Sequence, residues 1–279
     1  MGTQLDLFVG AGGNIAARDS QDLMAWPFFN LAKSKRVRPI DFRMGDVSIL
    51  VEATAEHGMA TIWDADILIW VASQIVEARD AGRATSRLIA ATPHEILAFT
   101  QRGTGKVSYE RLKAGLDRLQ STTIATSIRQ HDARRRHRFS WINEWKERIN
   151  GSGRALGIEM IIPDWFYEGV IDQALVLTID PAYFALTGGL YRLVRKHGGK
   201  QKGGWSFDFP HLHLKSGALS PMKRFAFELR GIVRRQALPG YALGIEHAHG
   251  RERLRFVPIP VDPFDAAMRR VGNRPVDKA

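Results

Sequence analysis

Apolar positions in the first half of the chain follow a helical period in three segments. The first begins at Asp64, a residue type that caps helix N-termini. The second begins at Thr92, where Pro93 suits the first helical turn and Glu95 completes a capping box. The third begins at Ser108. The apolar faces of the first and third helices are Ile67, Leu68, Val71, Ile75, Ala78, Tyr109, Leu112, Leu116 and Leu119.

The period then changes from helical to extended. Residues 122–128 are rich in β-branched side chains, which favour strands, and residues 42–62 predict an earlier strand or hairpin. A basic segment at 134–138 precedes expected strands at 139–149 and 156–162. This order predicts a winged helix, which has three helices, a strand, a charged loop and a returning strand. The third helix would be its recognition helix and the loop its wing.

The same order of elements returns in the second half. The expected elements are a bridging helix from Pro163 to about residue 173, a strand at 175–179, a helical region at 181–197, a Gly/Lys loop at 198–204, a short helix at 209–215, a helix from Ser220-Pro221 to about 236, and strands at 241–247 and 253–257. The sequence therefore predicts an α+β fold with two tandem winged-helix domains. Its parts are a flexible leader at 1–22, a first domain at 23–162, a second domain at 163–262 and a C-terminal tail at 263–279.

The composition of the chain is that of a globular protein. Its 279 residues are enough for two domains, and 44% are hydrophobic against 25% charged. No run of about 18 apolar residues predicts a membrane span, and the N-terminus lacks a secretory signal. The absence of cysteine excludes disulfides and thiolate metal sites. We therefore expect a cytoplasmic protein without a membrane segment.

The positive charge is concentrated in two places. The net charge is +11, and residues 192–235 hold 11 Lys and Arg against 2 Asp and Glu. Residues 129–154 hold 8 against 3, so the remainder of the chain is slightly acidic. A generally basic surface would spread its charge more evenly. One basic region in each half instead favours two surfaces that contact nucleic-acid phosphates.

The helix that follows Ser220 carries the clearest chemistry. Its apolar stripe is Met222, Phe225, Ala226, Leu229, Ile232 and Val233, and Lys223, Phe227, Arg230 and Arg234 lie opposite, flanked by Arg224 and Arg235. A helix fits the major groove of DNA, where arginine can contact guanine through two hydrogen bonds. A solvated basic face is the alternative. The short helix before it and the basic hairpin after it favour recognition.

The hairpin at 242–258 alternates arginine with apolar residues, which suits a wing lying along DNA. Charge protection of an edge strand is the alternative interpretation. The DNA-binding residues predicted for the second domain are Lys215, Lys223, Arg224, Phe227, Arg230, Arg234, Arg235, Arg251, Arg253 and Arg255. Those predicted for the first domain are Lys106, Arg111, Lys113, Arg118, Arg134, Arg135, Arg136 and Arg138.

Several collinear motifs resemble one protein family. They are Met24 to Phe29 with Leu31 to Lys35, Thr104 to Lys106 with Tyr109, Arg111 to Thr123, Thr126 to Arg129, Tyr191 to Leu193 with Arg195 to His197, Leu214 to Gly217, and Pro221 to Arg230. Over residues 24–260 the chain resembles the replication initiator protein A family of bacterial plasmids.

The resemblance implies two winged helices that bind repeated double-stranded origin sequences (iterons) and recruit the host initiator and helicase. Such initiators often repress their own promoter, usually as dimers. By this resemblance Lys223, Arg224, Arg230 and Arg234 would make the main base contacts. The first domain would contact DNA in a monomer or pair with a second subunit in a homodimer.

The leader contains a second motif. Gln4, Leu5, Asp6, Leu7 and Phe8 match the pentapeptide by which bacterial proteins dock on the replicative sliding clamp. Leu7 and Phe8 can fill an apolar pocket, and Gln4 can hydrogen-bond at a second subsite. A flexible leader suits such peptide capture. We therefore expect clamp binding, although an unremarkable apolar start of the chain is the alternative.

Other functions receive less support from the sequence. His211-Leu212-His213 has the His-apolar-His form of rolling-circle nicking enzymes, with Tyr241 as a nominal nucleophile. The two histidines lie in a probable helix, where residues two apart do not share a face, and a third ligand is missing. The Gly103 to Lys106 segment lacks the spacing of a P-loop. We therefore expect an origin-binding protein with no catalytic residues, metal or cofactor; a nicking enzyme and a plain winged-helix repressor are the alternatives.

Overall fold

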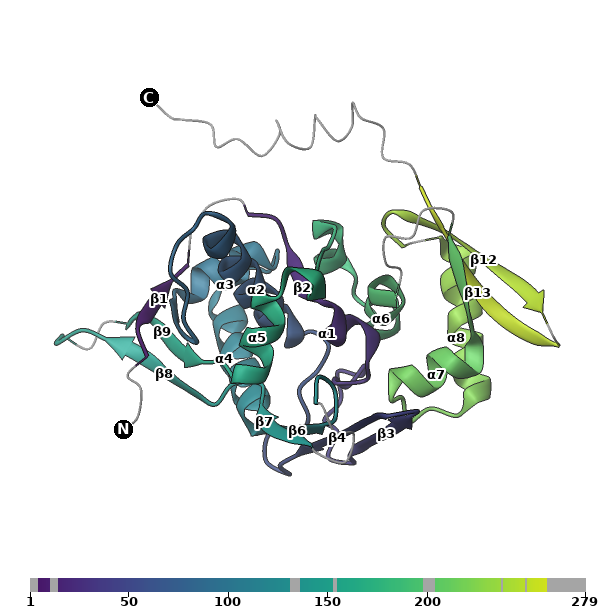
Figure 1. The fold of residues 1–279 in the computed structure, drawn as a ribbon, viewed down its shortest axis with the longest axis horizontal. Helices are drawn as coiled ribbons and strands as arrows, with labels where there is room; N and C mark the ends of the chain where they lie inside the picture. Colours follow the sequence, from purple (N-terminus) through teal and green to yellow (C-terminus); the bar gives the residue numbers. More distant parts are fainter. Residues whose placement is uncertain are drawn as a thin grey trace.

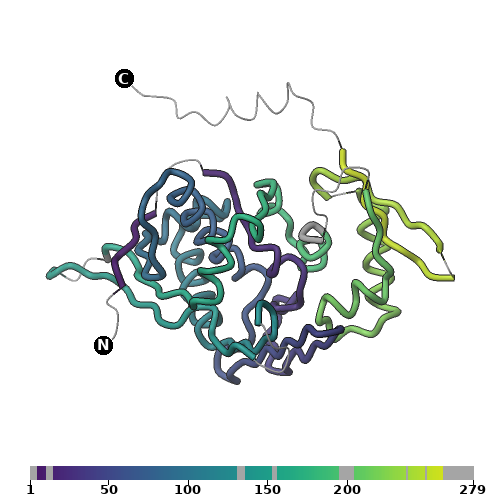
Figure 2. The backbone as a smooth tube through the Cα atoms, in the orientation of Figure 1, coloured from purple at the N-terminus to yellow at the C-terminus, as the bar shows by residue number. Residues whose placement is uncertain are grey.

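The computed structural model describes residues 5–10, 15–130, 136–152, 155–197, 204–236, 238–248 and 250–259. These residues form a mixed α+β fold with a larger and a smaller lobe (Figure 1). The helices α1 (Gln21–Ala25) and α6 (Gly189–His197) lie between the lobes. In Figure 2 the N-terminal segment, in purple, runs along the larger lobe and ends in the space between the two.

The larger lobe is built around α2 (Ala65–Asp80), which is buried on nearly all sides. A helix that is apolar all round belongs in a core rather than at a surface. Three more helices complete this lobe: α3 (Pro93–Phe99), α4 (Lys106–Ser121) and α5 (Asp164–Ile171). The predicted capping box is confirmed, because Thr92 accepts a hydrogen bond from the backbone of Glu95 while Glu95 accepts one from that of Thr92.

Two four-stranded sheets flank these helices. One has the order β1 (Leu7–Val9), β5 (Leu88–Ala91), β9 (Ala155–Ile161), β8 (Glu144–Ile149). The other has the order β3 (Ile40–Met44), β4 (Val47–Ala53), β6 (Thr122–Thr126), β7 (His137–Ser140). Of the strand or hairpin expected at 42–62, the structure has the hairpin of β3 and β4, which ends at Ala53, and residues 54–62 form no strand. The strand expected at 139–149 is two strands that belong to different sheets.

The smaller lobe is a three-stranded sheet covered by helices. Its strand order is β11 (Trp205–Asp208), β13 (Arg251–Pro258), β12 (Tyr241–Ala248), all antiparallel. The helices α7 (Phe209–Ser216) and α8 (Met222–Arg235) pack beside it (Figure 1). Phe209, Phe225 and Phe256 are fully buried in the core of this lobe.

The leader predicted as flexible contains two strands, so that expectation is wrong for its described residues. β1 pairs in parallel with β5, and β2 (Arg18–Ser20) pairs with β10 (Val176–Thr178). Local periodicity could not reveal these strands, because three residues are too few to show alternation and their partners are distant in sequence. Two short 3₁₀ helices, Gln173–Leu175 and Pro181–Ala185, flank β10.

The boundary expected at residue 163 does not coincide with the division between the cores. Trp165, Phe166 and Val170 of α5 lie in the hydrophobic core of the larger lobe. Ile69 of α2 and Met24 of α1 contribute to the core of the smaller lobe. The lobes therefore share packing, and α5 belongs with the first.

Candidate functional site

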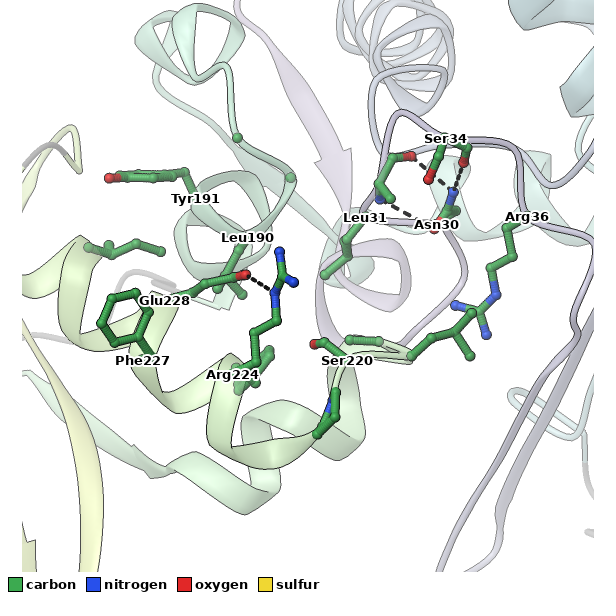
Figure 3. Close-up of a pocket in the computed structure, with 18 of the residues that line it drawn as sticks. Asn30, Leu31, Ser34, Arg36, Leu190, Tyr191, Ser220, Arg224, Phe227 and Glu228 are labelled. Carbon is green, nitrogen blue, oxygen red and sulfur yellow. Dashed lines mark hydrogen bonds and ion pairs between the residues drawn. The ribbon is translucent and has the colours of Figure 1, made fainter.

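A groove of about 820 Å³ separates α8 from the segment 30–38 of the larger lobe (Figure 3). The side of α8 that faces it carries Arg224, Phe227, Glu228, Gly231, Arg234 and Arg235. These positions are three or four residues apart, so they form one stripe along the helix. The apolar stripe of α8 packs into the core of the smaller lobe through the buried Phe225 and Leu229, and Phe225 also borders the groove. The amphipathic pattern read from the sequence is therefore present.

The groove side of α8 combines exposed cations with an exposed ring. Phe227 is 65% exposed, which is unusual for so large an apolar side chain. Arg224 lies 3.1 Å from Glu228 (Figure 3), and Arg235 donates a hydrogen bond of 2.7 Å to the Tyr191 hydroxyl. Arg234 is exposed and has no ion-pair partner among the residues that the structure describes. Arg234 is therefore the cation on this stripe most available to an external anion.

Arg230 is engaged within the protein instead. Its Nε lies 2.9 Å from one carboxylate oxygen of Glu252 in β13, and its Nη2 lies 2.5 Å from the other. These hydrogen bonds from Arg230 hold the pKa of Glu252 below its usual range. The sequence predicts Arg230 as a DNA contact, and in this structure its charge is matched by Glu252. Lys223 is exposed at the start of α8 and does not line the groove.

The arginines of the hairpin also have acidic partners. Arg253 lies 2.9 Å from Asp208, and Arg255 lies 3.1 Å from Glu246. Arg251 is farther from Asp208, at 3.9 Å, and is more exposed than Arg253. The strand that carries them, β13, pairs on both sides, so protection of a sheet edge does not explain their charge.

Lys215 contacts an aromatic ring of the larger lobe. Its Nζ lies 4.4 Å from the centre of the Trp26 ring, in a contact between α7 and the larger lobe. Burial lowers the pKa of Lys215. Because burial as well as the aromatic contact withdraws its charge from solvent, Lys215 is a weaker candidate for a DNA contact than the exposed lysines.

The predicted cations of α4 divide into two groups. Lys106 and Arg111 are exposed, with Lys106 only 4.0 Å from Glu110. Lys113 pairs with Glu147 of β8. Arg118 makes two hydrogen bonds, of 2.8 and 2.7 Å, to Asp64 at the N-terminus of α2. Lys106 and Arg111 are open to a ligand, whereas Arg118 has a structural partner that the sequence did not reveal.

Part of the predicted basic wing lies outside the described residues, namely Arg134 and Arg135. Arg136 is exposed just before β7, and Arg138 lies 3.2 Å from Glu52 of β4. β7 pairs antiparallel with β6, with Phe139 opposite Ile124. The described part of this segment therefore belongs to a hairpin, as expected of a wing.

The pentapeptide predicted to bind the sliding clamp is partly in regular structure. Gln4 lies outside the described residues, and Leu5 and Asp6 precede β1. Leu7 is 45% exposed, but Phe8 is only 6% exposed because it packs into the core of the larger lobe. In this arrangement Phe8 is not available to a pocket on another protein.

The residues nominated for nicking are engaged elsewhere. His211 stacks on Phe207, and His213 Nε2 lies 2.7 Å from the carbonyl oxygen of Ser220. Tyr241 is 7% exposed and packs against Trp205. Within the described part of the chain, no three His, Asp or Glu side chains are grouped to hold a metal ion. None of the described helices is long and apolar enough to cross a membrane.

The segment across the groove from α8 contains part of the family-like motif at Leu31 to Lys35, but its cations are not among the DNA contacts predicted from the sequence. Lys35, Arg36 and Arg38 of this segment line the groove, and Lys33 and Lys35 line a second cavity of about 590 Å³. The signal was present as four cations within six residues, from Lys33 to Arg38. These four cations lie outside the two basic regions on which the prediction of DNA contacts rests, residues 129–154 and 192–235.

Comparisons with known proteins identify relatives of the whole fold. The family model described as "Replication initiator protein A" matches residues 18–243. A protein of Wigglesworthia glossinidia brevipalpis named "Putative replication protein" is 32% identical over 226 residues, which cover 78% of this chain and 81% of that protein.

Two solved structures share the fold at low sequence identity. A crystal structure of domains 2 and 3 of RctB matches with a TM-score of 0.59 at 12% identity, over 82% of this chain and 94% of that one. A second RctB structure of domains 2–3 matches with a TM-score of 0.54 at 11% identity, over 88% of this chain and 98% of that one. The likeness therefore extends across both lobes.

Proposed function

Because the chain belongs to the replication initiator protein A family, it is a replication initiator, and we propose that it binds repeated double-stranded sequences at a plasmid origin. The observation that carries this proposal is the groove-facing stripe of α8. Arg224, Phe227 and Arg234 give it cations for phosphates or guanine and an apolar ring for a thymine methyl group. The proposal assigns no catalytic role to the protein.

We propose that each lobe contains a winged helix. In the smaller lobe the supporting order is α6, β11, α7, α8, β12 and β13, with β13 at the centre of the sheet. In this assignment α8 is the recognition helix and the turn between β12 and β13 is the wing. In the larger lobe α4 followed by the β6–β7 hairpin would take the same parts.

The direct test is binding to the DNA that flanks the gene for this protein. Footprinting should protect repeated sites of common sequence, and fluorescence anisotropy should give an affinity at least a thousandfold above that for unrelated DNA. Arg234→Ala should weaken specific binding, and Arg83→Ala, at an exposed arginine outside both cavities, is the matched control. Equal affinity for origin and unrelated duplexes would sink the proposal.

The alternative of a nicking enzyme has a separate test. Supercoiled and single-stranded origin DNA, incubated with Mg²⁺ or Mn²⁺, should remain uncut. Tyr241 is buried and His213 is engaged with Ser220, which supports this expectation. Metal-dependent cleavage that Tyr241→Phe abolishes would replace the proposal with the nicking function.

Contacts with other proteins form the second part of the proposal. The initiator would recruit the host initiator and helicase, and a homodimer would repress the promoter of its own gene. Docking on the sliding clamp requires β1 to leave the sheet so that Phe8 can enter a pocket. β1 is a three-residue edge strand paired only with β5 among the described strands, which supports a low cost of release.

A further inference from the structure

The segment 30–38 is held by hydrogen bonds within itself, by backbone hydrogen bonds to Met59 and Ala60 of the larger lobe, and by one side-chain hydrogen bond to the end of α7. The Asn30 amide donates hydrogen bonds of 2.9 Å to the carbonyl oxygens of Ala32 and Ser34. The buried Arg36 donates to the carbonyl oxygens of Arg38 and Pro39, and also to that of Gly217 at the end of α7, at 2.6 Å. The segment is therefore a fixed ledge between the lobes, which we call the 30–38 ledge.

Three cations of the ledge point away from these anchors. Lys33, Lys35 and Arg38 are exposed, whereas Arg36 is 7% exposed. None of the three has an ion-pair partner among the residues that the structure describes. The Lys33 ammonium lies 5.3 Å from the centre of the Trp63 ring, and the stem of Lys35 passes over Gly58. Their charge is thus available to an external anion.

The ledge lies between two cationic cavities. The 820 Å³ groove is bordered on its far side by α8, and the 590 Å³ cavity is bordered by Arg102, Arg111 and Arg118. Ser34 and Lys35 line both. The acidic lining residues are Glu228 and Asp64, and each is paired with an arginine of the same cavity. The unmatched charge along this path is therefore positive.

From this arrangement we propose that Lys33, Lys35 and Arg38 bind the phosphate backbone of the DNA duplex whose major groove receives α8. This inference rests on the proposed function. A helix in the major groove is bordered by two phosphate strands. The ledge faces α8 across an open groove (Figure 3), where one of those strands would pass. Because its backbone is already ordered, the ledge loses little conformational entropy on binding.

Phosphate contacts have a measurable signature that base contacts lack. Each phosphate neutralised by a cation makes the negative slope of log K against log salt concentration steeper by about 0.9. The triple variant Lys33→Gln, Lys35→Gln, Arg38→Gln should therefore bind origin DNA roughly ten- to a hundredfold more weakly at about 0.1 M salt. The magnitude of its salt slope should be smaller by about 2–3. The ratio of specific to unrelated DNA binding should change little.

Two further variants make the result decisive. The double variant Arg43→Gln, Arg83→Gln removes charge from exposed residues that line neither cavity and lie outside the two basic regions of the sequence, and it should keep wild-type affinity and slope. The charge-retaining variant Lys33→Arg, Lys35→Arg, Arg38→Lys should also bind as wild type. Thermal melting of all three should match that of the wild-type protein.

The outcomes separate this inference from the proposed function. If the wild-type protein does not distinguish origin DNA from unrelated DNA, the proposed function fails. If wild type binds specifically and the ledge variant has unchanged or higher affinity with an unchanged slope, only the inference is overturned. An equal loss of affinity per charge removed in this control would also overturn it, because net charge alone would then explain the effect.

Discussion

Arg192 in α6 places its Nη1 2.5 Å from Oδ1 of Asp66 in α2, and both side chains are almost completely buried. The other carboxylate oxygen of Asp66 lies 2.8 Å from Arg102. Arg192 also donates hydrogen bonds to the carbonyl oxygens of Leu186 and Phe184. The pair therefore joins the helix between the lobes to the central helix of the larger lobe.

Replacement of Arg192 by methionine should destabilise the whole chain by about 3–5 kcal/mol, because it removes half of a buried, hydrogen-bonded pair. Urea unfolding followed by tryptophan fluorescence measures this change. The double variant Asp66→Leu, Arg192→Met should lose less than the sum of the single variants, since it leaves neither charge of the pair buried alone. A loss below about 1 kcal/mol for Arg192→Met would contradict this role.

Sequence patterns predicted best those features that are set by residues close together in the chain. The capping box at Thr92 and Glu95 is such a feature, since its hydrogen bonds join residues three apart. Asp64 shows the opposite case. Its carboxylate does not cap α2 but accepts hydrogen bonds from Arg118 and from the backbone of Thr61. The pattern predicted the helix, whereas the distant arginine determined what the aspartate does.

The candidate site also combines features set by local sequence with features set by residues that are distant in sequence. Helical spacing predicted the exposed cations of α8, because that face follows from the position of the apolar stripe. It did not predict that Glu252 holds Arg230, or that Trp26 covers Lys215, because both partners come from other elements. The 30–38 ledge has no periodic structure, so its importance depends on its position between the lobes.

The position of Lys215 leads to a prediction about stability. Lys215→Met keeps the apolar stem and removes a charge whose pKa is lowered by burial. We expect stability to change by less than about 1 kcal/mol, since the lost contact with Trp26 offsets the relieved desolvation. The affinity for origin DNA should change by less than about twofold, with no change in salt slope. A clear loss of affinity, measured by anisotropy, would restore Lys215 as a DNA contact.

Two arginines of α8 should differ in their effect on DNA binding. Arg234→Ala should cost about 1–3 kcal/mol of specific binding if Arg234 reads a base, with relaxed preference at one position of the site. Arg230→Ala should cost less, because Glu252 already engages that guanidinium. Binding to a panel of single-base variants of the site distinguishes the two. A larger loss for Arg230→Ala would mean that DNA displaces Glu252.

In the larger lobe, we expect Arg118 to contribute to stability and Arg111 to contribute to DNA binding. Arg118→Ala leaves the carboxylate of Asp64, which is 4% exposed, without its ion pair and the two hydrogen bonds from the guanidinium. We expect a loss of about 3 kcal/mol in unfolding free energy. Arg111→Ala should leave stability unchanged but weaken binding to origin DNA and lower the salt slope by about 1. The reverse pattern would assign Arg118 to the interface.

Docking of the leader on the sliding clamp should depend on release of β1. Exposing Phe8 costs about 2 kcal/mol of burial, which lowers the apparent clamp affinity by roughly thirtyfold relative to a free peptide of the same sequence. The chain has no cysteine, so the pair Val9→Cys, Ala90→Cys can lock β1 to β5 across a registered position outside the pentapeptide. The oxidised pair should lose clamp binding in a pull-down, whereas the reduced pair and each single variant should retain it. Equal binding by the oxidised and reduced forms would mean that β1 need not open, and deletion of residues 1–10 without effect would exclude the leader as the docking segment.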